Sequence, residues 1–263
     1  MQVDPDPLGT REAWPRAVVF DHDGVLVDSI RPDFQACLRV FAEHGVELPA
    51  ERWGREVCGN TGGYTALFQL LTDPADCTGD ARVSDAGALV PSREGVSRPT
   101  VEELRARLEA YWDELLVPAN VPLMPGVREL LTRLTARGVR LAVASSADRR
   151  WVTRMLAHHG LAGFFETVVG GDDVARAKPA PDVYREALSR LGVAPEHALA
   201  VEDSLTGVSA ARAAGLRVVA VPTPYTRSLD YGAAHARITG LPLLTDDLLN
   251  RLLEEDEHVP YVR

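Results

Sequence analysis

Two acidic side chains come directly after the first apolar run of the chain. Asp21 and Asp23 follow residues 18–20, and Gly24 comes next. In a strand the side chains alternate between faces, which would place Asp21 and Asp23 on one face and His22 on the other. Two neighbouring carboxylates repel each other unless a divalent cation offsets their charge. The pattern therefore indicates a metal site, with a solvated strand end and a turn-forming Asp-Gly pair as the alternative.

Polar residues also end two later apolar runs. Ser145 follows residues 141–144, and the pair Glu202-Asp203 follows residues 198–201. The carboxyl ends of parallel strands meet at one edge of a sheet, where α/β proteins bind their ligands. We therefore expect these side chains to lie together with Asp21 at that edge.

The elements that would position these residues alternate from residue 122 onward. Apolar runs predict strands at residues 139–144, 167–170, 199–201 and 218–221. Helical spacing, with glycine or proline at the ends, predicts helices between Gly126 and Gly138 and over residues 148–159, 181–191 and 208–214. This alternation predicts right-handed βαβ units, and hence an α/β fold with a Rossmann-like parallel sheet and helices on both faces.

The segment 31–118 shows no strand pattern. Helical spacing appears around Phe34 and Tyr64, and Thr100 with Glu103 forms a capping-box pattern at the start of a third helix. We expect a smaller all-helical domain at 31–118, inserted into a core of residues 17–30 and 119–263. Three segments are expected to lie outside this regular structure. They are a flexible leader at 1–16, a flexible polar stretch at 72–99 and an acidic tail that follows a helix at 243–253.

Composition excludes several classes of partner. The chain has 263 residues and a formal net charge of −10, which disfavours binding to nucleic acid or to an anionic membrane surface. No apolar stretch approaches the length of a membrane span. The three cysteines, Cys37, Cys58 and Cys77, show no CxxC spacing. These features predict a reduced, cytoplasmic protein whose oligomeric state stays open.

The ordered set of motifs resembles the haloacid dehalogenase superfamily of aspartate-nucleophile phosphohydrolases. The motifs are Asp-x-Asp-Gly at Asp21, a serine after an apolar strand at Ser145, Lys178-Pro179, and Glu202-Asp203-Ser204 after an apolar strand. The resemblance extends from about Val18 to Val221, and it is close to phosphoglycolate phosphatases and to β-phosphoglucomutase-like phosphatases. It implies that the helical insert is a mobile cap over the active site.

The resemblance implies a catalytic role for each motif residue. Asp21 would be the nucleophile that forms an aspartyl-phosphate, and Asp23 the general acid and base. Lys178 would neutralise the phosphate and the nucleophile. Ser145 would hydrogen-bond a phosphoryl oxygen, with Ser146 contributing a backbone amide.

The resemblance also implies a cofactor and a substrate-contacting loop. Mg²⁺ would bind Asp21, the main-chain carbonyl of Asp23, and Asp203, with Glu202 binding directly or through water. The loop Gly59-Asn60-Thr61 would contact the substrate. The expected activity is therefore Mg²⁺-dependent hydrolysis of a small phosphorylated metabolite, and the sequence does not name the ester.

Single residues distinguish the expected phosphatase activity from other activities that use the same motifs. A sugar phosphomutase of the β-phosphoglucomutase type would carry a cap histidine where this chain has Asp33, and a basic residue where it has Gly62. A dehalogenase would need neither Asp23 nor a metal pair. Phosphonate hydrolysis would need a cap lysine, and residues 31–118 contain none. A non-catalytic binding protein is expected to have lost at least one of the four motif residues, all of which are present.

Overall fold

A computed structural model describes residues 14–60, 62–72 and 98–254. The predicted leader up to residue 13, Thr61, most of the stretch 72–99 and the acidic tail lie outside the described residues. The chain divides into two compact units. The core unit contains the chain up to Leu26, Met124–Pro222 and the part from Asp230 onward, and the helical unit contains Val27–Leu123 and Thr223–Leu229.

The core unit is built on a parallel sheet. Within the described residues the sheet has six strands, in the order β3-β2-β1-β4-β5-β6, and every neighbouring pair is parallel. The strands are β1 (Ala17–Phe20), β2 (Arg140–Ala144), β3 (Thr167–Val169), β4 (Ala198–Glu202), β5 (Arg217–Ala220) and β6 (Ala236–Arg237). All residues of β1 and β4 are buried, as expected for central strands that are covered on both faces.

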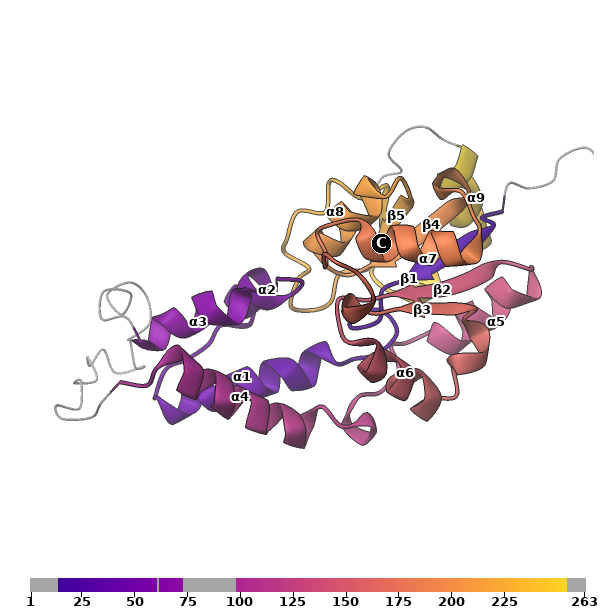
Figure 1. Cartoon of the computed structure of the whole chain (residues 1–263). Coiled ribbons are helices and arrows are strands. Elements are labelled where there is room, and N and C mark those ends of the chain that lie inside the picture. Colours follow the sequence, from indigo (N-terminus) through magenta and orange to yellow (C-terminus); the bar gives the residue numbers. More distant parts are fainter. Residues whose placement is uncertain (1–13, 61, 73–97, 255–263) are drawn as a thin grey trace, which may run out of the picture. The chain divides into compact units, whose positions relative to one another are not determined.

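Helices cover both faces of this sheet (Figure 1), which confirms the predicted α/β fold. The α-helices of the core unit are α5 (Val127–Ala136), α6 (Arg149–His158), α7 (Asp182–Leu191), α8 (Leu205–Ala213) and α9 (Asp246–Glu254). Short 3₁₀ turns join them at Ala162–Phe164, Gly171–Asp173, Pro195–His197 and Leu241–Leu243. The helices turn their apolar sides to the sheet, so that α7 buries Val183, Tyr184, Ala187, Leu188 and Leu191.

Two details of the core unit differ from the sequence-based expectation. The strand β6 lies in the segment 222–242, for which no strand was predicted, and two residues are too few to give a periodic signal. Arg16 was assigned to the leader, but its backbone already continues the ladder of β1. Its amide donates to His197 O at 2.8 Å, and its carbonyl accepts from the amide of Arg140 at 3.0 Å.

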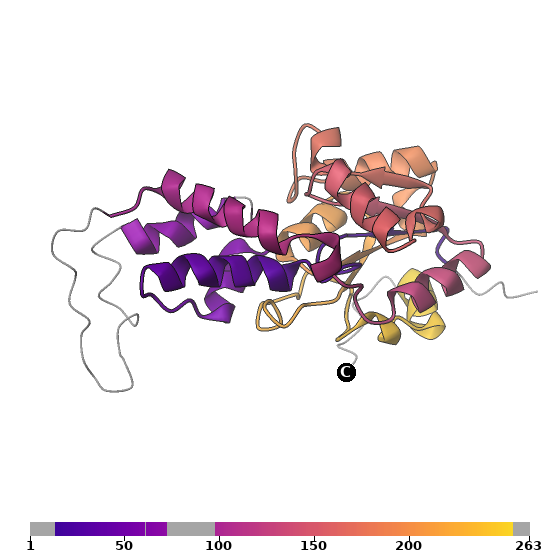
Figure 2. The same cartoon turned by 90° about the horizontal axis from the view of Figure 1, so that it is seen from below.

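The helical unit contains α-helices and one 3₁₀ turn, and no named strand lies in its described residues. The helices are α1 (Ile30–Glu43), α2 (Ala50–Val57), α3 (Gly63–Thr72) and α4 (Val101–Leu115), followed by a 3₁₀ turn at Pro118–Asn120. Figure 2 shows α1 and α4 side by side. The predicted capping box is confirmed. The hydroxyl of Thr100 accepts from the amide of Glu103 at 3.1 Å, and the Glu103 carboxylate accepts from the amide of Thr100 at 2.7 Å. Helix α2 was not predicted.

The segment Thr223–Leu229 belongs to the helical unit, although the sequence-based division assigned it to the core. The ring of Tyr225 lies 5.0 Å from that of Phe34 and 5.4 Å from that of Trp53, measured between centroids. Gly54 makes this contact possible, because a Cβ there would lie 2.0 Å from the carbonyl oxygen of Tyr225. The boundaries at residues 31 and 118 stay a prediction.

Candidate active site

The candidate catalytic residues of the core unit gather where β1, β2 and β4 end. Asp21 comes directly after β1, Ser145 directly after β2, and Glu202 is the last residue of β4. The amide of Asp21 donates to the carbonyl of Val201 at 2.9 Å, which extends the pairing of β1 with β4. The chain passes from β1 to β2 on one side, whereas β4 lies on the other. The acids therefore lie at the topological switch point, where α/β sheets bind ligands.

Lys178 holds this edge together from a loop between β3 and α7. Its Nζ donates to Asp21 Oδ1 at 2.5 Å, to Glu202 Oε1 at 2.6 Å and to the carbonyl of Ala144 at 2.9 Å. These bonds use all three donor hydrogens of the ammonium. Burial alone would lower the pKa of Lys178, but the carboxylates of Asp21 and Glu202 outweigh it and raise that pKa above its ordinary value. The amine therefore stays charged at any physiological pH.

Three buried carboxylates lie around this ammonium. Oxygen atoms of Asp21, Glu202 and Asp203 lie within 4.8 Å of one another. Burial raises the pKa of Asp21 to about 7, even though Lys178 opposes the shift. Burial also raises the pKa of Asp203 well above its ordinary value, and the charges of Asp21 and Glu202 raise it further. One ammonium leaves these acids under-compensated, and a divalent cation with oxygen ligands would supply the missing charge. The donor set therefore fits Mg²⁺.

Asp23 has different neighbours from Asp21. Its Oδ1 accepts a hydrogen bond from the indole Nε1 of Trp151 at 3.1 Å, and its Oδ2 lies 3.1 Å from Nδ1 of His22. The side chain is 24% exposed, against 10% for Asp21. The strand ends at Phe20, so strict alternation no longer governs residues 21–23. Asp23 therefore has a polar neighbour at each carboxylate oxygen and is still more exposed to solvent than Asp21.

The two serines differ in their surroundings. Ser145 is buried, and its Oγ accepts from the amide of Ala147 at 3.0 Å, which leaves the hydroxyl hydrogen to donate. It follows Ala144, whose carbonyl binds Lys178, so Ser145 lies at the same edge. Ser146 is exposed. The structure therefore favours Ser145 as the hydroxyl donor at this edge.

The substrate loop predicted at Gly59-Asn60-Thr61 lies in the helical unit. Gly59 and Asn60 are exposed, and Oδ1 of Asn60 accepts from the amide of Gly62 at 3.1 Å. Thr61 lies outside the described residues. The contact of this loop with a substrate stays a prediction.

Sequence reasoning missed the aromatic residues that surround the acids. The hydroxyl of Tyr184 donates to Glu202 Oε1 at 2.5 Å, and that of Tyr231 donates to the carbonyl of Asp203. A signal for Tyr184 existed, because it lies on the apolar face of the predicted helix 181–191. A tyrosine that is buried on such a face must find an acceptor for its hydroxyl, and the nearest strand ends in acids.

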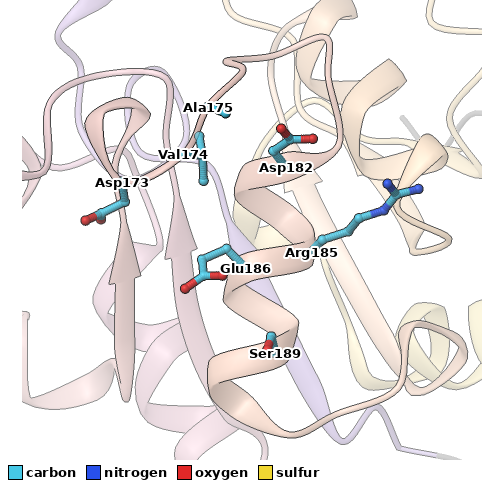
Figure 3. Close-up of a pocket in the computed structure, with 7 residues that line it drawn as sticks. All are labelled: Asp173, Val174, Ala175, Asp182, Arg185, Glu186 and Ser189. Carbon is cyan, nitrogen blue, oxygen red and sulfur yellow. The ribbon is translucent and has the colours of Figure 1, made fainter.

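The opposite side of α7 lines a surface hollow of about 430 Å³ (Figure 3). Asp182, Arg185, Glu186 and Ser189 line it from successive turns of the helix. Two of the lining acids have partners that do not line the hollow, since Asp182 pairs with Arg176 and Glu186 pairs with Arg190. The hollow shares no lining residue with the acid cluster. Helix α7 therefore has one charged, solvated face and one buried face, and the buried face carries Tyr184.

The motif residues and their geometry agree with a sequence family. The sequence model described as haloacid dehalogenase-like hydrolase matches residues 18–221. The chain belongs to this family. It is therefore a hydrolase of the haloacid dehalogenase superfamily, as the ordered motifs predicted. Separately, no described helix has the length and apolar character that a membrane span requires.

Several named proteins are similar to this hydrolase over most of its length. Protein CbbY of Rhodobacter capsulatus is 35% identical over 233 residues, which cover 86% of this chain and 93% of that protein. Phosphoglycolate phosphatase of Nitrosococcus oceani is 30% identical, over 82% of this chain and 88% of that enzyme. A crystal structure of a CbbY variant from Rhodobacter sphaeroides, in complex with xylulose 1,5-bisphosphate, matches with a TM-score of 0.63. Its identity is 27%, and the match covers 88% of this chain and 96% of the other.

Proposed function

We propose that this hydrolase is a Mg²⁺-dependent phosphatase that cleaves a small phosphorylated metabolite through a phosphoenzyme at Asp21. The observation that carries the proposal is the buried contact between Lys178 Nζ and Asp21 Oδ1 at 2.5 Å, beside the carboxylates of Glu202 and Asp203. A fixed carboxylate nucleophile next to a permanent positive charge suits attack on a phosphate dianion. The named relatives, which include a phosphatase, support the same reaction.

In the first half of the reaction the carboxylate of Asp21 attacks phosphorus in line with the leaving oxygen. Lys178 offsets the negative charge of the phosphoryl oxygens and keeps the carboxylate in place. The hydroxyl of Ser145 donates to a phosphoryl oxygen. Asp23, which is more open to solvent than Asp21, gives its proton to the leaving alkoxide.

In the second half of the reaction water attacks the aspartyl-phosphate. Asp23 has become a carboxylate and takes the proton from that water, so one side chain serves as acid and then as base. The backbone amide of Ser146 would donate to the phosphoryl group. Inorganic phosphate leaves, and Asp21 and Asp23 return to their starting states.

Mg²⁺ would be held by Asp21, Asp203 and the main-chain carbonyl of Asp23, and when bound it would neutralise charge on the phosphoryl oxygens. With the cation present, the pKa of Asp21 would fall from about 7, since the cation favours its ionised form. Asp21 would then be available as a nucleophile throughout the neutral pH range.

A phosphorylated sugar or a similarly small phosphate ester is the substrate class that the relatives suggest. The loop Gly59-Asn60-Thr61 would contact the leaving group and contribute to substrate choice. The buried Cys37, a free thiol that accepts a hydrogen bond from the indole of Trp53, supports a reducing, cytoplasmic setting.

A phosphomutase is the main alternative, and Asp33 argues against it. Both carboxylate oxygens of Asp33 accept hydrogen bonds within the helical unit, from Trp112 Nε1 at 2.7 Å and from the Tyr64 hydroxyl at 2.5 Å. This carboxylate therefore ties α1 to α3 and α4. Such a side chain is a structural anchor rather than a substitute for the cap histidine that the mutase would need.

A panel of phosphate esters tests the proposal. Purified protein with Mg²⁺ should release inorganic phosphate from one or more sugar phosphates or phosphoglycolate, and excess chelator should abolish the release. The Asp21→Asn variant, which keeps the shape of the side chain, should release none. Turnover that survives chelation, or a full rate in Asp21→Asn, would overturn the proposed mechanism.

A further inference from the structure

We propose that Glu202 positions Lys178 and does not ligate the metal, and that Tyr184 is the residue that holds Glu202 in this role. The inference rests on the proposed phosphatase function and refines it, because the predicted metal ligands included Glu202. It assigns a function to a tyrosine that none of the sequence motifs contains.

Hydrogen-bond donors occupy the carboxylate of Glu202 completely. Its Oε1 accepts from Lys178 Nζ at 2.6 Å and from the Tyr184 hydroxyl at 2.5 Å. Its Oε2 accepts from the amides of Asp203 and Ser204 at 3.2 and 3.4 Å, and from the Ser204 hydroxyl at 3.2 Å. A carboxylate offers about four lone-pair sites. Five donors leave no lone pair for a cation.

The packing around Glu202 prevents its carboxylate from turning toward a metal. Glu202 is fully buried at the end of β4. A Cβ at Gly207 would lie 2.0 Å from Cδ and Oε1 of Glu202, and 2.1 Å from Oε2. The backbone of α8 therefore lies directly against the carboxylate. Asp21 and Asp203 are therefore the side chains of the cluster that we assign as metal ligands.

Tyr184 contacts both partners of the Lys178–Glu202 ion pair. Its hydroxyl donates to Glu202, and its ring centroid lies 5.0 Å from the ammonium nitrogen of Lys178. The ring is therefore close enough for a cation–π attraction that favours the charged amine. Helix α7 packs on β2 and β3, which fixes the ring relative to the sheet. Tyr184 thus sets the position of the positive charge that faces Asp21.

In this arrangement the binding of the phosphoryl group and the binding of the cation depend on different residues. Removal of the Tyr184 hydroxyl should loosen Lys178, and should therefore weaken the binding of a phosphoryl group. It should leave the cation ligands in place. Loss of Asp203, in contrast, should remove the cation itself.

Calorimetry on the full-length protein tests the assignment with Mg²⁺ and inorganic phosphate as probes. In Tyr184→Phe we expect the Kd for Mg²⁺ to stay within about threefold of wild type. We expect the Kd for phosphate on the Mg²⁺-loaded protein to rise about tenfold, a typical effect of losing a partner behind a directly binding residue. With p-nitrophenyl phosphate, kcat/KM should fall by a similar factor.

Two controls separate positioning from general destabilisation and from loss of charge. Leu188→Ala weakens the packing of the same helix one turn after Tyr184, and should lower Tm while both Kd values stay unchanged. Glu202→Gln and Asp203→Asn each remove one negative charge. Asp203→Asn should weaken Mg²⁺ binding at least tenfold more than Glu202→Gln does.

Equal losses of Mg²⁺ affinity in Glu202→Gln and Asp203→Asn would overturn the inference. So would a Tyr184→Phe protein whose Mg²⁺ affinity falls as much as its phosphate affinity, or whose phosphate affinity does not change. If Glu202→Gln does not fold, the Kd values of Tyr184→Phe for Mg²⁺ and phosphate test the inference alone. If the wild type cleaved no phosphate ester, the proposed function would fail, whereas the Mg²⁺ titrations would still judge the role of Glu202.

Discussion

Replacement of Gly207 by alanine tests the packing of the site most sharply. Gly207 lies in the first turn of α8, where alanine would favour the helix by about 1 kcal/mol. The new Cβ would, however, meet the Glu202 carboxylate at 2.0 Å, so that carboxylate must move. Its displacement breaks the bonds to Lys178 and Tyr184 and leaves buried charges poorly paired, which costs about 3–5 kcal/mol. We expect a net loss of roughly 2–4 kcal/mol and a decrease in Tm of roughly 5–15 °C.

The assay is a thermal melt followed by circular dichroism, together with phosphate release from the best ester of the panel. Gly163→Ala is the matched control, because a Cβ at Gly163 would have no heavy atom within 4 Å. That variant should keep the wild-type Tm and activity, while Gly207→Ala should melt at a lower temperature and lose activity. The reasoning would be refuted if Gly207→Ala melted at or above the wild-type temperature with normal turnover.

Three further predictions concern pH, the helical unit and Asp23. Because burial raises the pKa of Asp21 from 3.8 to about 7, its contribution to the stability of the metal-free protein is full below about pH 4 and lost as pH rises to about 7. Mg²⁺ competes with that proton and should raise Tm more at pH 8 than at pH 5; an equal rise would contradict this. Thr100→Ala removes the capping box of α4 and should lower the free energy of unfolding in urea by about 1 kcal/mol; no change would mean that the cap contributes nothing. Trp151→Phe releases Oδ1 of Asp23 and should lower kcat about tenfold with KM nearly unchanged; an unchanged kcat would show that Trp151 does not orient Asp23.

The sequence could predict the sheet and the edge at which the acids gather, because both depend on local patterns. Buried parallel strands are continuous apolar runs, so the polar residue that ends each run marks the carboxyl edge. This placed Asp21, Ser145 and Glu202 at one edge. The capping box at Thr100 was equally local, since its two partners are three residues apart.

The remaining features depend on contacts between distant residues. Helix α2 has only eight residues, and its buried side, Trp53, Gly54 and Val57, is shorter than the window of 11–18 residues in which helical periodicity is recognised. Tyr225 packs in the helical unit against the rings of Phe34 and Trp53, which are far away in the sequence. The hydrogen bonds that fill the carboxylate of Glu202 depend on Lys178, Tyr184 and the position of α8. Residue spacing in the sequence does not predict contacts among such distant parts of the chain.

Detection of the phosphorylated residue tests the central claim most directly. The wild-type protein is mixed with substrate and Mg²⁺ in a rapid-quench device, and acyl phosphates are reduced with borohydride, which converts an aspartyl-phosphate to homoserine. Peptide mass spectrometry should find homoserine at position 21 during turnover, and none at position 23. The same treatment of Asp21→Asn should give none at either position. A label at position 23 or at another acid, or turnover with no label in the wild type, would contradict the account.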